Sequence, residues 1–417
     1  MNNRNLKDRW NNIVYLWTGG YLKMVPDNIK NIISPEKVYK RLVLILKYLI
    51  ADFLKLFKKD NIPEKKIWFL VFSKNNIDSL KNIKQGIPNS VYVTFFRFNS
   101  KLNIKTYYFS LRFRFLYDFI FPIYWFRYYQ TNRLKALRCI DLLFLVNGSY
   151  EESLRLLKRK KPQALVFSND HMIIPRALLL AAKKLGIKTY YIQHASVTSY
   201  FPPLEFTYAL LEGEDALNKY KICGPVESKV FLIGMPKFDS YSESYNKNSR
   251  LKNIGVAYNL IDEIDSLYKF LLQLQLSNPE IKIIVRPHPS DDRILPNMEK
   301  IEFSDSKFES SFEFLNKIDC LISGSSSIHL EAVLLNVYPC YYDFGEKKNF
   351  DSYKYVENGM VEYFEYFEHL NTKIEELKNF KPNIQYKAKY YNSSLESDFY
   401  GKSSSKSIEI ILETLKL

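Results

Sequence analysis

The sequence predicts an α/β protein made of two domains that face a cleft, preceded by a basic, aromatic N-terminal region. The chain has 417 residues, which is more than one hydrophobic core usually serves. Short β-branched runs alternate with helical patterns in two successive stretches, and a polar run separates the stretches. We therefore predict a basic amphipathic region at 1–60, Rossmann-like domains at 61–240 and 253–400 with a linker at 241–252, and a final helix at 401–417.

The first domain begins after Lys65 with a strand–helix–strand pattern. Its strands are expected at residues 67–72, 90–96, 141–146, 164–168, 188–193, 206–211 and 230–233. Its helices are expected at residues 77–87, from 147 through 160, and at 174–185. An aromatic insertion interrupts this pattern between the second and third strands.

Two strand–loop runs in the second domain predict a phosphate site. The apolar run from Ile281 to Val285 ends at Arg286-Pro287-His288-Pro289, which places Arg286 and His288 at the carboxyl end of a buried strand. A short strand at 319–322 leads into the small-residue turn from Ser323 to Ser327 and a helix at 328–335. Parallel sheets bind ligands at the carboxyl ends of their strands, and the first N–H groups of a helix attract anions. Two neighbouring loops are therefore expected to hold one phosphate.

The excess positive charge is confined to the N-terminal part. The net charge is +15, and residues 1–160 contain 30 Lys and Arg against 11 Asp and Glu. Aromatic residues crowd positions 107–129, and residues 43–59 place apolar side chains at near-helical spacing between lysines. This mixture suits the head-group region of an anionic bilayer, so we expect a membrane surface as a partner. The alternative is that the aromatics face the core and the lysines face solvent.

Other functional classes find little support. Lys47, Asp52 and Lys55 interrupt the best candidate for a membrane-spanning helix, and residues 1–30 lack the apolar centre of a signal peptide. The four cysteines form no CxxC pair, which disfavours disulfides and zinc and fits a reducing cytoplasm. No metal and no cofactor are expected. We predict a cytoplasmic protein at the inner face of the membrane.

The candidate catalytic residues follow strands of the first domain. His194 comes directly after the strand at 188–193, and a neutral imidazole can accept a proton from a hydroxyl, so His194 is the candidate general base. Asp170 and His171 end the preceding strand and could orient His194 or an acceptor; the alternative is that Asp170 caps the next helix. His329 and His369 are expected to be structural.

Several carboxylates have open assignments. Glu331 lies one helical turn beyond Ser327, where it could accept hydrogen bonds from ribose hydroxyls. Glu212, Glu214 and Asp215 follow a strand and could supply an alternative base, although the start of a helix explains them more simply.

The two phosphate loops, read as RPHP and SGSSSIHLEA, together with the tail from Asp398 to Ser404, resemble bacterial surface-polysaccharide glycosyltransferases of the GT-B fold. That group includes sialyl-, polysialyl- and Kdo transferases, which use CMP-activated sugars, and the teichoic acid polyol-phosphate transferases. The resemblance covers about residues 160–415 and implies that His288, Pro289, Ser325, Ser326 and Ser327 bind the donor phosphate.

The sequence departs from the motifs of this group at one position. Many of those enzymes have an acidic-acidic-Gly motif where this chain has Gln193-His194-Ala195, which is closer to the His-Gly of polyol-phosphate transferases. The same segment is also similar to UDP-sugar 2-epimerases. The base and the class of donor therefore stay open.

These observations favour an inverting, metal-independent glycosyltransferase. It would move a sugar, such as a CMP-activated sialic-acid-like or Kdo-like sugar, from a nucleotide donor to a hydroxyl of a capsule, lipopolysaccharide or related glycan. A UDP-sugar 2-epimerase and a polyol-phosphate transferase are the alternatives. A nucleic-acid-binding protein is a remote one, because it leaves the two phosphate loops unexplained.

Overall fold

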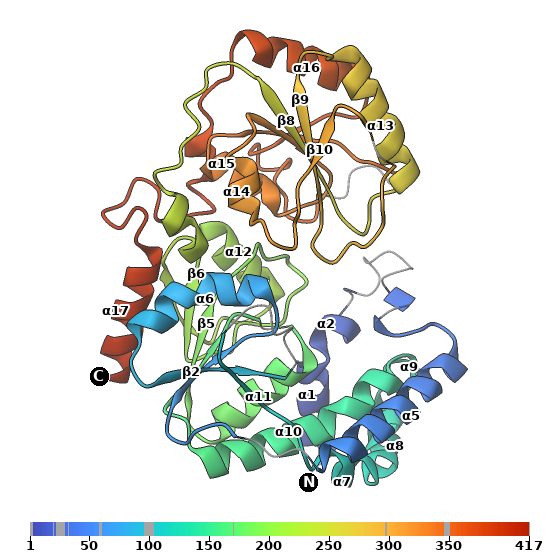
Figure 1. The fold of residues 1–417 in the computed structure, drawn as a ribbon. Coiled ribbons are helices and arrows are strands. Elements are labelled where there is room, and N and C mark those ends of the chain that lie inside the picture. The colour runs from blue at the N-terminus through green and yellow to red at the C-terminus, as the bar shows by residue number, and fades with distance from the viewer. Residues whose placement is uncertain are drawn as a thin grey trace. The chain divides into compact units, whose positions relative to one another are not determined.

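The computed structural model describes residues 3–19, 21, 30–31, 33–57, 61–95, 104–169, 171–296, 298–345 and 351–416 (Figure 1). The chain forms two compact units. The first contains Met1–Leu211, Ala216–Leu232 and Ser404–Leu417, and the second contains Glu212–Asp215 and Ile233–Ser403. The segment expected to be a linker, 241–252, lies within the second unit.

The first unit is built on a seven-stranded parallel sheet with the order β3-β2-β1-β4-β5-β6-β7. Its strands are β1 (Ile67–Leu70), β2 (Ser90–Thr94), β3 (Thr106–Tyr108), β4 (Ala164–Phe167), β5 (Lys188–Ile192), β6 (Tyr208–Leu211) and β7 (Lys229–Leu232). Every residue of β1 and β4 is buried, as expected for central strands covered on both faces. The strand β3 lies inside the stretch that was expected to be an insertion.

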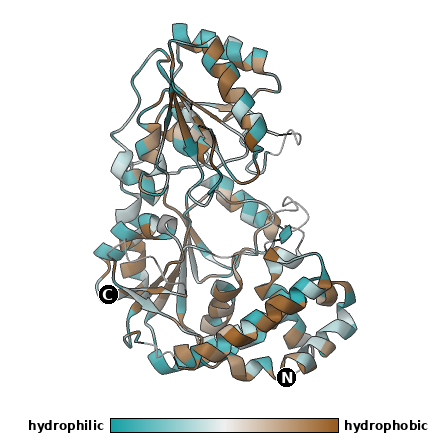
Figure 2. Cartoon of the chain, turned by 45° about the vertical axis from the view of Figure 1, so that its right-hand side comes forward, coloured by the Kyte–Doolittle hydropathy of each residue, from teal (hydrophilic) through white to brown (hydrophobic). Residues whose placement is uncertain are grey.

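Helices cover this sheet and extend beyond it. They are α1 (Asn3–Ile13), α2 (Tyr15–Thr18), α5 (Val38–Lys55), α6 (Lys74–Gly86), α7 (Arg114–Asp118), α8 (Phe121–Thr131), α9 (Arg133–Arg138), α10 (Ile140–Lys160), α11 (Ile173–Lys184), α12 (Glu214–Cys223) and α17 (Ser403–Leu415). Figure 1 shows α5, α7, α8 and α9 gathered around α10, and Figure 2 shows apolar residues along α5. No helix in the described part of the chain is long and apolar enough to span a membrane.

The prediction of a strand at 141–146 is wrong. These residues form the first turns of α10, a helix of 21 residues. Leu142, Leu143, Phe144 and Val146 are all buried, because α10 is enclosed by other helices. A short apolar run has the same pattern in a buried helix as in a buried strand, so periodicity could not separate the two.

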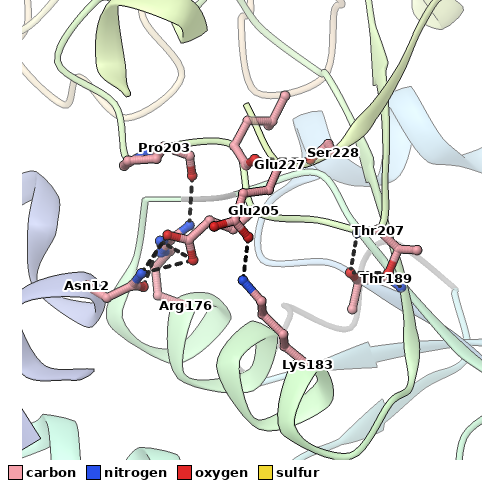
Figure 3. A network of polar contacts seen from close by, with 10 residues as sticks. Asn12, Arg176, Lys183, Thr189, Pro203, Glu205, Thr207, Glu227 and Ser228 are labelled. Carbon is pink, nitrogen blue, oxygen red and sulfur yellow. Dashed lines mark hydrogen bonds and ion pairs between the residues drawn. The ribbon is translucent and has the colours of Figure 1, made fainter. Parts of the chain in front are cut away.

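A buried polar network joins α1 to the rest of the first unit (Figure 3). The guanidinium of Arg176, on α11, donates to Asn12 Oδ1 at 2.6 Å and lies 3.4 Å from a carboxylate oxygen of Glu205. Asn12 Nδ2 in turn donates to both oxygens of Glu205, at 2.8 and 2.9 Å. These contacts satisfy the charge of an arginine whose side chain is almost fully buried, and they fix α1 against α11.

The C-terminal helix α17 also belongs to the first unit. Thr414 accepts a hydrogen bond from Lys188 Nζ on its carbonyl at 2.7 Å, and its hydroxyl lies 2.8 Å from that of Tyr190. Ile408 packs against Gly86 so closely that a Cβ at Gly86 would lie 2.3 Å from it. The last segment of the sequence thus completes the unit that the first segment begins.

The second unit is built on a six-stranded parallel sheet with the order β10-β9-β8-β11-β12-β13. Its strands are β8 (Asn253–Tyr258), β9 (Lys282–Pro287), β10 (Ile301–Phe303), β11 (Cys320–Ser323), β12 (Tyr338–Tyr341) and β13 (Glu362–Tyr363). Its helices are α13 (Ile264–Ser277), α14 (Ser311–Leu315), α15 (Ile328–Leu334) and α16 (Phe367–Asn379), with 3₁₀ turns η2 (Pro236–Tyr241) and η3 (Gln385–Ala388).

Candidate functional site

The second sheet brings both predicted phosphate loops to one edge. The order of its strands reverses between β8 and β11, because β9 and β10 continue on one side of β8 while β12 and β13 continue on the other. Such a reversal leaves a crevice at the carboxyl ends of the strands, where doubly wound sheets bind ligands. His288 follows β9 and the serine turn follows β11, so the two loops flank the loop after β8.

The loop after β8 connects the two phosphate loops. Asn259 Nδ2 donates to the carbonyl of Ser325 at 3.1 Å. On the other side, the backbone N–H of His288 donates to Tyr258 O at 2.9 Å. Arg293 donates to the carbonyls of Asn259 and Asp262, each at 2.8 Å. These bonds hold the three loops in one fixed arrangement.

The serine turn is partly exposed, and two of its hydroxyl groups have protein contacts: Ser325 Oγ lies 2.7 Å from Ser352 Oγ, and Ser326 Oγ accepts the backbone N–H of Ile328 at 3.4 Å. Ser325, Ser326 and Ser327 are each half-buried, whereas Ser323 is buried and donates to Ala257 O at 2.8 Å. Helix α15 begins at Ile328 and has seven residues, which is slightly shorter than predicted. The dipole of so short a helix is small, so an anion here would depend mainly on hydroxyl and backbone N–H donors.

A buried carboxyl lies directly beneath this turn. A Cβ added to Gly324 would lie 3.0 Å from Asp262 Oδ1, so any other residue here would require Asp262 to shift by a few tenths of an ångström. Burial raises the pKa of Asp262 to about 7, and Asp343 adds to the rise. Asp262 Oδ2 accepts the backbone N–H of Asn259 at 2.7 Å. Its raised pKa keeps negative charge low where a phosphate would bind.

His288 and Arg286 have different surroundings although they are two residues apart. His288 reaches solvent, and its Nδ1 accepts the backbone N–H of Ser290 at 3.1 Å, which leaves Nε2 for a ligand. Desolvation of the ring and the charge of Arg286 lower the pKa of His288, against the opposing effect of Asp291.

Arg286 is buried and already has protein partners. Its Nη1 donates to Ser304 Oγ at 2.7 Å, its Nη2 donates to Glu309 O at 2.9 Å, and its guanidinium lies over the ring of Phe314. This geometry favours a role in holding the loop after β9.

Glu331 lies in a second buried polar cluster. One carboxylate oxygen, Oε1, forms an ion pair with Lys237 Nζ, and Oε2 is buried and accepts no hydrogen bond from the described residues. Burial raises the pKa of the nearby Glu212 to about 8; Glu331 and Asp215 add to the rise and Lys237 opposes it. Burial thus disfavours a charge on Glu212, and Glu331 Oε2 is enclosed by protein.

His329, one of the two other histidines of the second unit, lies in its core. His329 is fully buried, and its Nε2 lies 3.0 Å from Gly324 O. Its ring stacks on Tyr341, and burial lowers its pKa to about 4. The neutral ring thus supports the serine turn from below.

The candidate residues of the first unit also follow strands of one sheet edge. His194 is half-buried and comes two residues after β5. The neighbouring Gln193 is held by a bond from its N–H to Leu210 O at 3.0 Å. His171 follows β4; its ring stacks on Phe201 and its Nε2 lies 3.3 Å from Asn169 Nδ2. Asp170 lies outside the described residues.

No protein-family model matches the chain, and no curated protein matches it by sequence. Several solved structures do match. A UDP-GlcNAc 2-epimerase from Neisseria meningitidis bound to UDP-GlcNAc has a TM-score of 0.53 and 14% identity, over 84% of this chain and 99% of that chain. The wall teichoic acid polymerase TagF, in a crystal soaked with CDPG, has a TM-score of 0.53 and 14% identity, over 91% of this chain and 98% of that chain. The glycotransferase of kitacinnamycin has a TM-score of 0.53 and 10% identity, over 84% of this chain and 99% of that chain.

The chain has the GT-B fold. This confirms the predicted fold class, since both parallel α/β sheets are present and the similar structures cover most of the chain. At 10–14% identity the likeness concerns the fold of these GT-B proteins and leaves the reaction to be argued from the site.

Three site residues were missed by the sequence analysis. Asn259, Asp262 and Arg293 build the loop between the two phosphate loops. The position of Asn259 directly after the β8 strand was a usable signal, because polar residues at strand ends line the crevice. Within the described residues, no group of three or more His, Cys, Asp or Glu side chains has the arrangement of a metal site.

Proposed function

We propose that the protein is a metal-independent glycosyltransferase that takes its sugar from a nucleotide donor. The observation that carries this proposal is the pairing of an exposed His288 with three half-buried serine hydroxyls, on loops that flank the strand at which the sheet reverses. Such donors suit the phosphate of a nucleotide leaving group. The similar structures, which include a protein bound to UDP-GlcNAc and one soaked with CDPG, support a nucleotide ligand.

In this mechanism the bond between the anomeric carbon and the phosphate oxygen breaks as the acceptor oxygen attacks. The electron pair of the broken bond stays on the nucleotide phosphate, where His288, Ser325, Ser326 and Ser327 donate hydrogen bonds to it. His194 accepts the proton of the attacking hydroxyl, and attack from the opposite face inverts the anomeric centre. Glu331 pairs with Lys237 and its Oε2 is buried, so no ribose contact is assigned to it. Arg286 holds the end of β9, just before His288, through Ser304 and Glu309.

The donor class proposed is a CMP-activated sugar of the sialic acid or Kdo kind, and the acceptor class is a hydroxyl of a capsule, lipopolysaccharide or related surface glycan. This rests on the RPHP and SGSSSIHLEA loops and their place in the fold. A polyol-phosphate transferase is the second candidate, because TagF covers 91% of the chain.

The first test is calorimetric titration of the full chain with CMP, CDP, UDP and GDP. We expect CMP to bind most tightly, and His288→Ala to weaken it about tenfold or more, as for loss of a charge-assisted hydrogen bond. His369→Ala is the matched control, because His369 is exposed on α16, away from these loops. A preference for CDP would favour the polyol-phosphate reaction, and the absence of binding by all four nucleotides would overturn the site.

The base is tested by transfer assays once a donor is known. His194→Ala should lower kcat by about 10²–10⁴. Near-full turnover of this variant would reject His194. Release of an epimerised sugar without any acceptor would identify a 2-epimerase instead.

A further inference from the structure

Helix α5 exposes its apolar face to solvent. Large apolar side chains follow one another at helical spacing along its outer side: Val38, Leu42, Leu46, Ile50, Leu54 and Phe57 just beyond its end. Leu46 is 57% exposed and Phe57 is 75% exposed. Its two fully buried residues are Arg41 and Asp52, and Ile45, Tyr48 and Leu49 pack partly buried against the core of the first unit. The helix is therefore apolar on its outer side as well as its inner side, whereas a helix that only covers a core is polar on its outer side.

Buried polar contacts fix this orientation. Asp52 forms an ion pair with Arg114, whose Nη2 donates to Oδ1 at 2.6 Å, and it accepts a hydrogen bond from Lys55 Nζ at 2.9 Å. At the other end of the helix, Arg41 donates to the carbonyls of Pro35 and Leu137. Turning the apolar face inward would break a buried ion pair, which is costly. The exposed apolar face is therefore part of the fold.

The apolar face continues onto the neighbouring helices. The ring of Phe53, on α5, lies 5.3 Å from that of Phe115, on α7, and Phe115 lies 4.9 Å from Phe119. Beyond them, Ile123 and Phe126 of α8 are more than half exposed. We call the exposed apolar side chains of α5, α7 and α8 the apolar surface. Continuous exposure of this kind is rare in soluble monomers and marks a binding surface.

The charges around the apolar surface have one sign. Residues 37–57 and 104–138 contain twelve Lys and Arg but only two acidic residues, Asp52 and Asp118. Both of these carboxyls are buried, so the acidic groups of these segments do not reach the surface. Lys40, Lys47 and Arg127 are exposed beside the apolar side chains.

We propose that the apolar surface docks onto an anionic phospholipid bilayer, with α5 and α8 lying in the plane of the head groups. Exposed Leu, Ile and Phe enter the acyl boundary while Lys and Arg contact the anionic head groups. A second copy of the chain would oppose like charges across its interface, and a nucleic acid would leave the apolar side chains uncovered. The inference does not depend on which nucleotide the second unit binds.

The test is co-sedimentation of the full chain with vesicles of phosphatidylcholine alone or mixed with phosphatidylglycerol. We expect binding to the anionic vesicles. The triple variant Leu46→Gln, Ile50→Gln, Leu54→Gln should lower this binding by about tenfold or more, because each side chain loses buried apolar area. The matched control, Ile222→Gln, Leu276→Gln, Ile294→Gln, changes three exposed apolar residues elsewhere and should bind as the unchanged chain does.

A variant with fewer positive charges separates the electrostatic contribution to vesicle binding from the apolar contribution. Lys40→Gln, Lys47→Gln, Arg127→Gln should weaken binding to anionic vesicles by about fivefold per charge. Binding by the α5 triple variant equal to that of the unchanged chain would overturn the proposal. Two other results would also overturn it. One is that the unchanged chain binds DNA, but not vesicles, at the same salt concentration. The other is that the unchanged chain is a dimer that does not bind vesicles and that the α5 triple variant is a monomer. The nucleotide titration, repeated on the α5 variant, shows independently whether the site in the second unit is intact.

Discussion

Helices α5 and α16 both pack apolar residues against a core, yet only α5 also carries large apolar residues on its outer side. Helix α16 buries Phe367, Leu370, Ile374 and Leu377 and exposes its charged residues. Helix α5 packs only Ile45, Tyr48 and Leu49 partly against the core and exposes Leu42, Leu46 and Leu54 on its other side. The comparison teaches that apolar periodicity identifies the apolar face of a helix but does not identify what covers that face.

The largest expected effect concerns the polar anchor of α5. Replacing Asp52 by Ala leaves Arg114 buried without its ion-pair partner, so the free energy of unfolding of the first unit should fall by about 3–5 kcal/mol. Tryptophan fluorescence during urea unfolding reports this unit, because all four tryptophans, Trp10, Trp17, Trp68 and Trp125, belong to it. The control is Asp8→Ala on α1 of the same unit, where the residue is exposed. A loss below about 1 kcal/mol would show that α5 is held by other contacts.

The next prediction compares the leucines directly. Leu370→Ala in α16 should destabilise the second unit by about 2–5 kcal/mol, because it opens a cavity in a closed core. Leu46→Ala in α5 should change the stability of the first unit by less than about 0.5 kcal/mol. Far-UV circular dichroism follows the first variant and tryptophan fluorescence follows the second. Equal losses in both would mean that α5 is covered in solution.

A smaller effect is expected on how the stability of the first unit depends on pH. Burial raises the pKa of Asp118, next to the Asp52–Arg114 pair, to about 7, and Asp52 adds to the rise. Between pH 4 and 7 the folded state therefore binds more protons than the unfolded state, so stability falls as pH increases, by about 1 kcal/mol per pH unit. Asp118→Asn should flatten this dependence. Thermal unfolding of both proteins across this range measures it, and parallel curves would contradict the assignment.

The sequence predicted what depends on local pattern. The end of the strand before Arg286-Pro287-His288-Pro289 could be predicted because an apolar run stops there at a proline-bounded turn. The carboxyl ends of parallel strands lie at one edge of the sheet, so the loops that follow them could be expected to lie together. The six-residue run at 141–146 was misread because a buried helix and a buried strand share the same apolar pattern.

What the sequence could not provide are partners that lie far along the chain. Arg286 was expected to face a phosphate, but Ser304 and Glu309 bind its guanidinium. Glu331 was expected to face ribose, and one of its oxygens pairs with Lys237, 94 residues away. The direction of the apolar face of α5 was equally hidden, because it depends on Arg114, 62 residues beyond Asp52.

The return of α17 to the first unit has a consequence for biosynthesis. Because Ser404–Leu417 follows the second unit along the chain, the first unit lacks this helix until the second unit has been translated. Until then Lys188, Tyr190 and Gly86 have no Thr414 and Ile408 to pack against. Completion of the first unit therefore waits for synthesis of the second, and a chain truncated before Ser404 loses contacts in the unit that was synthesised first.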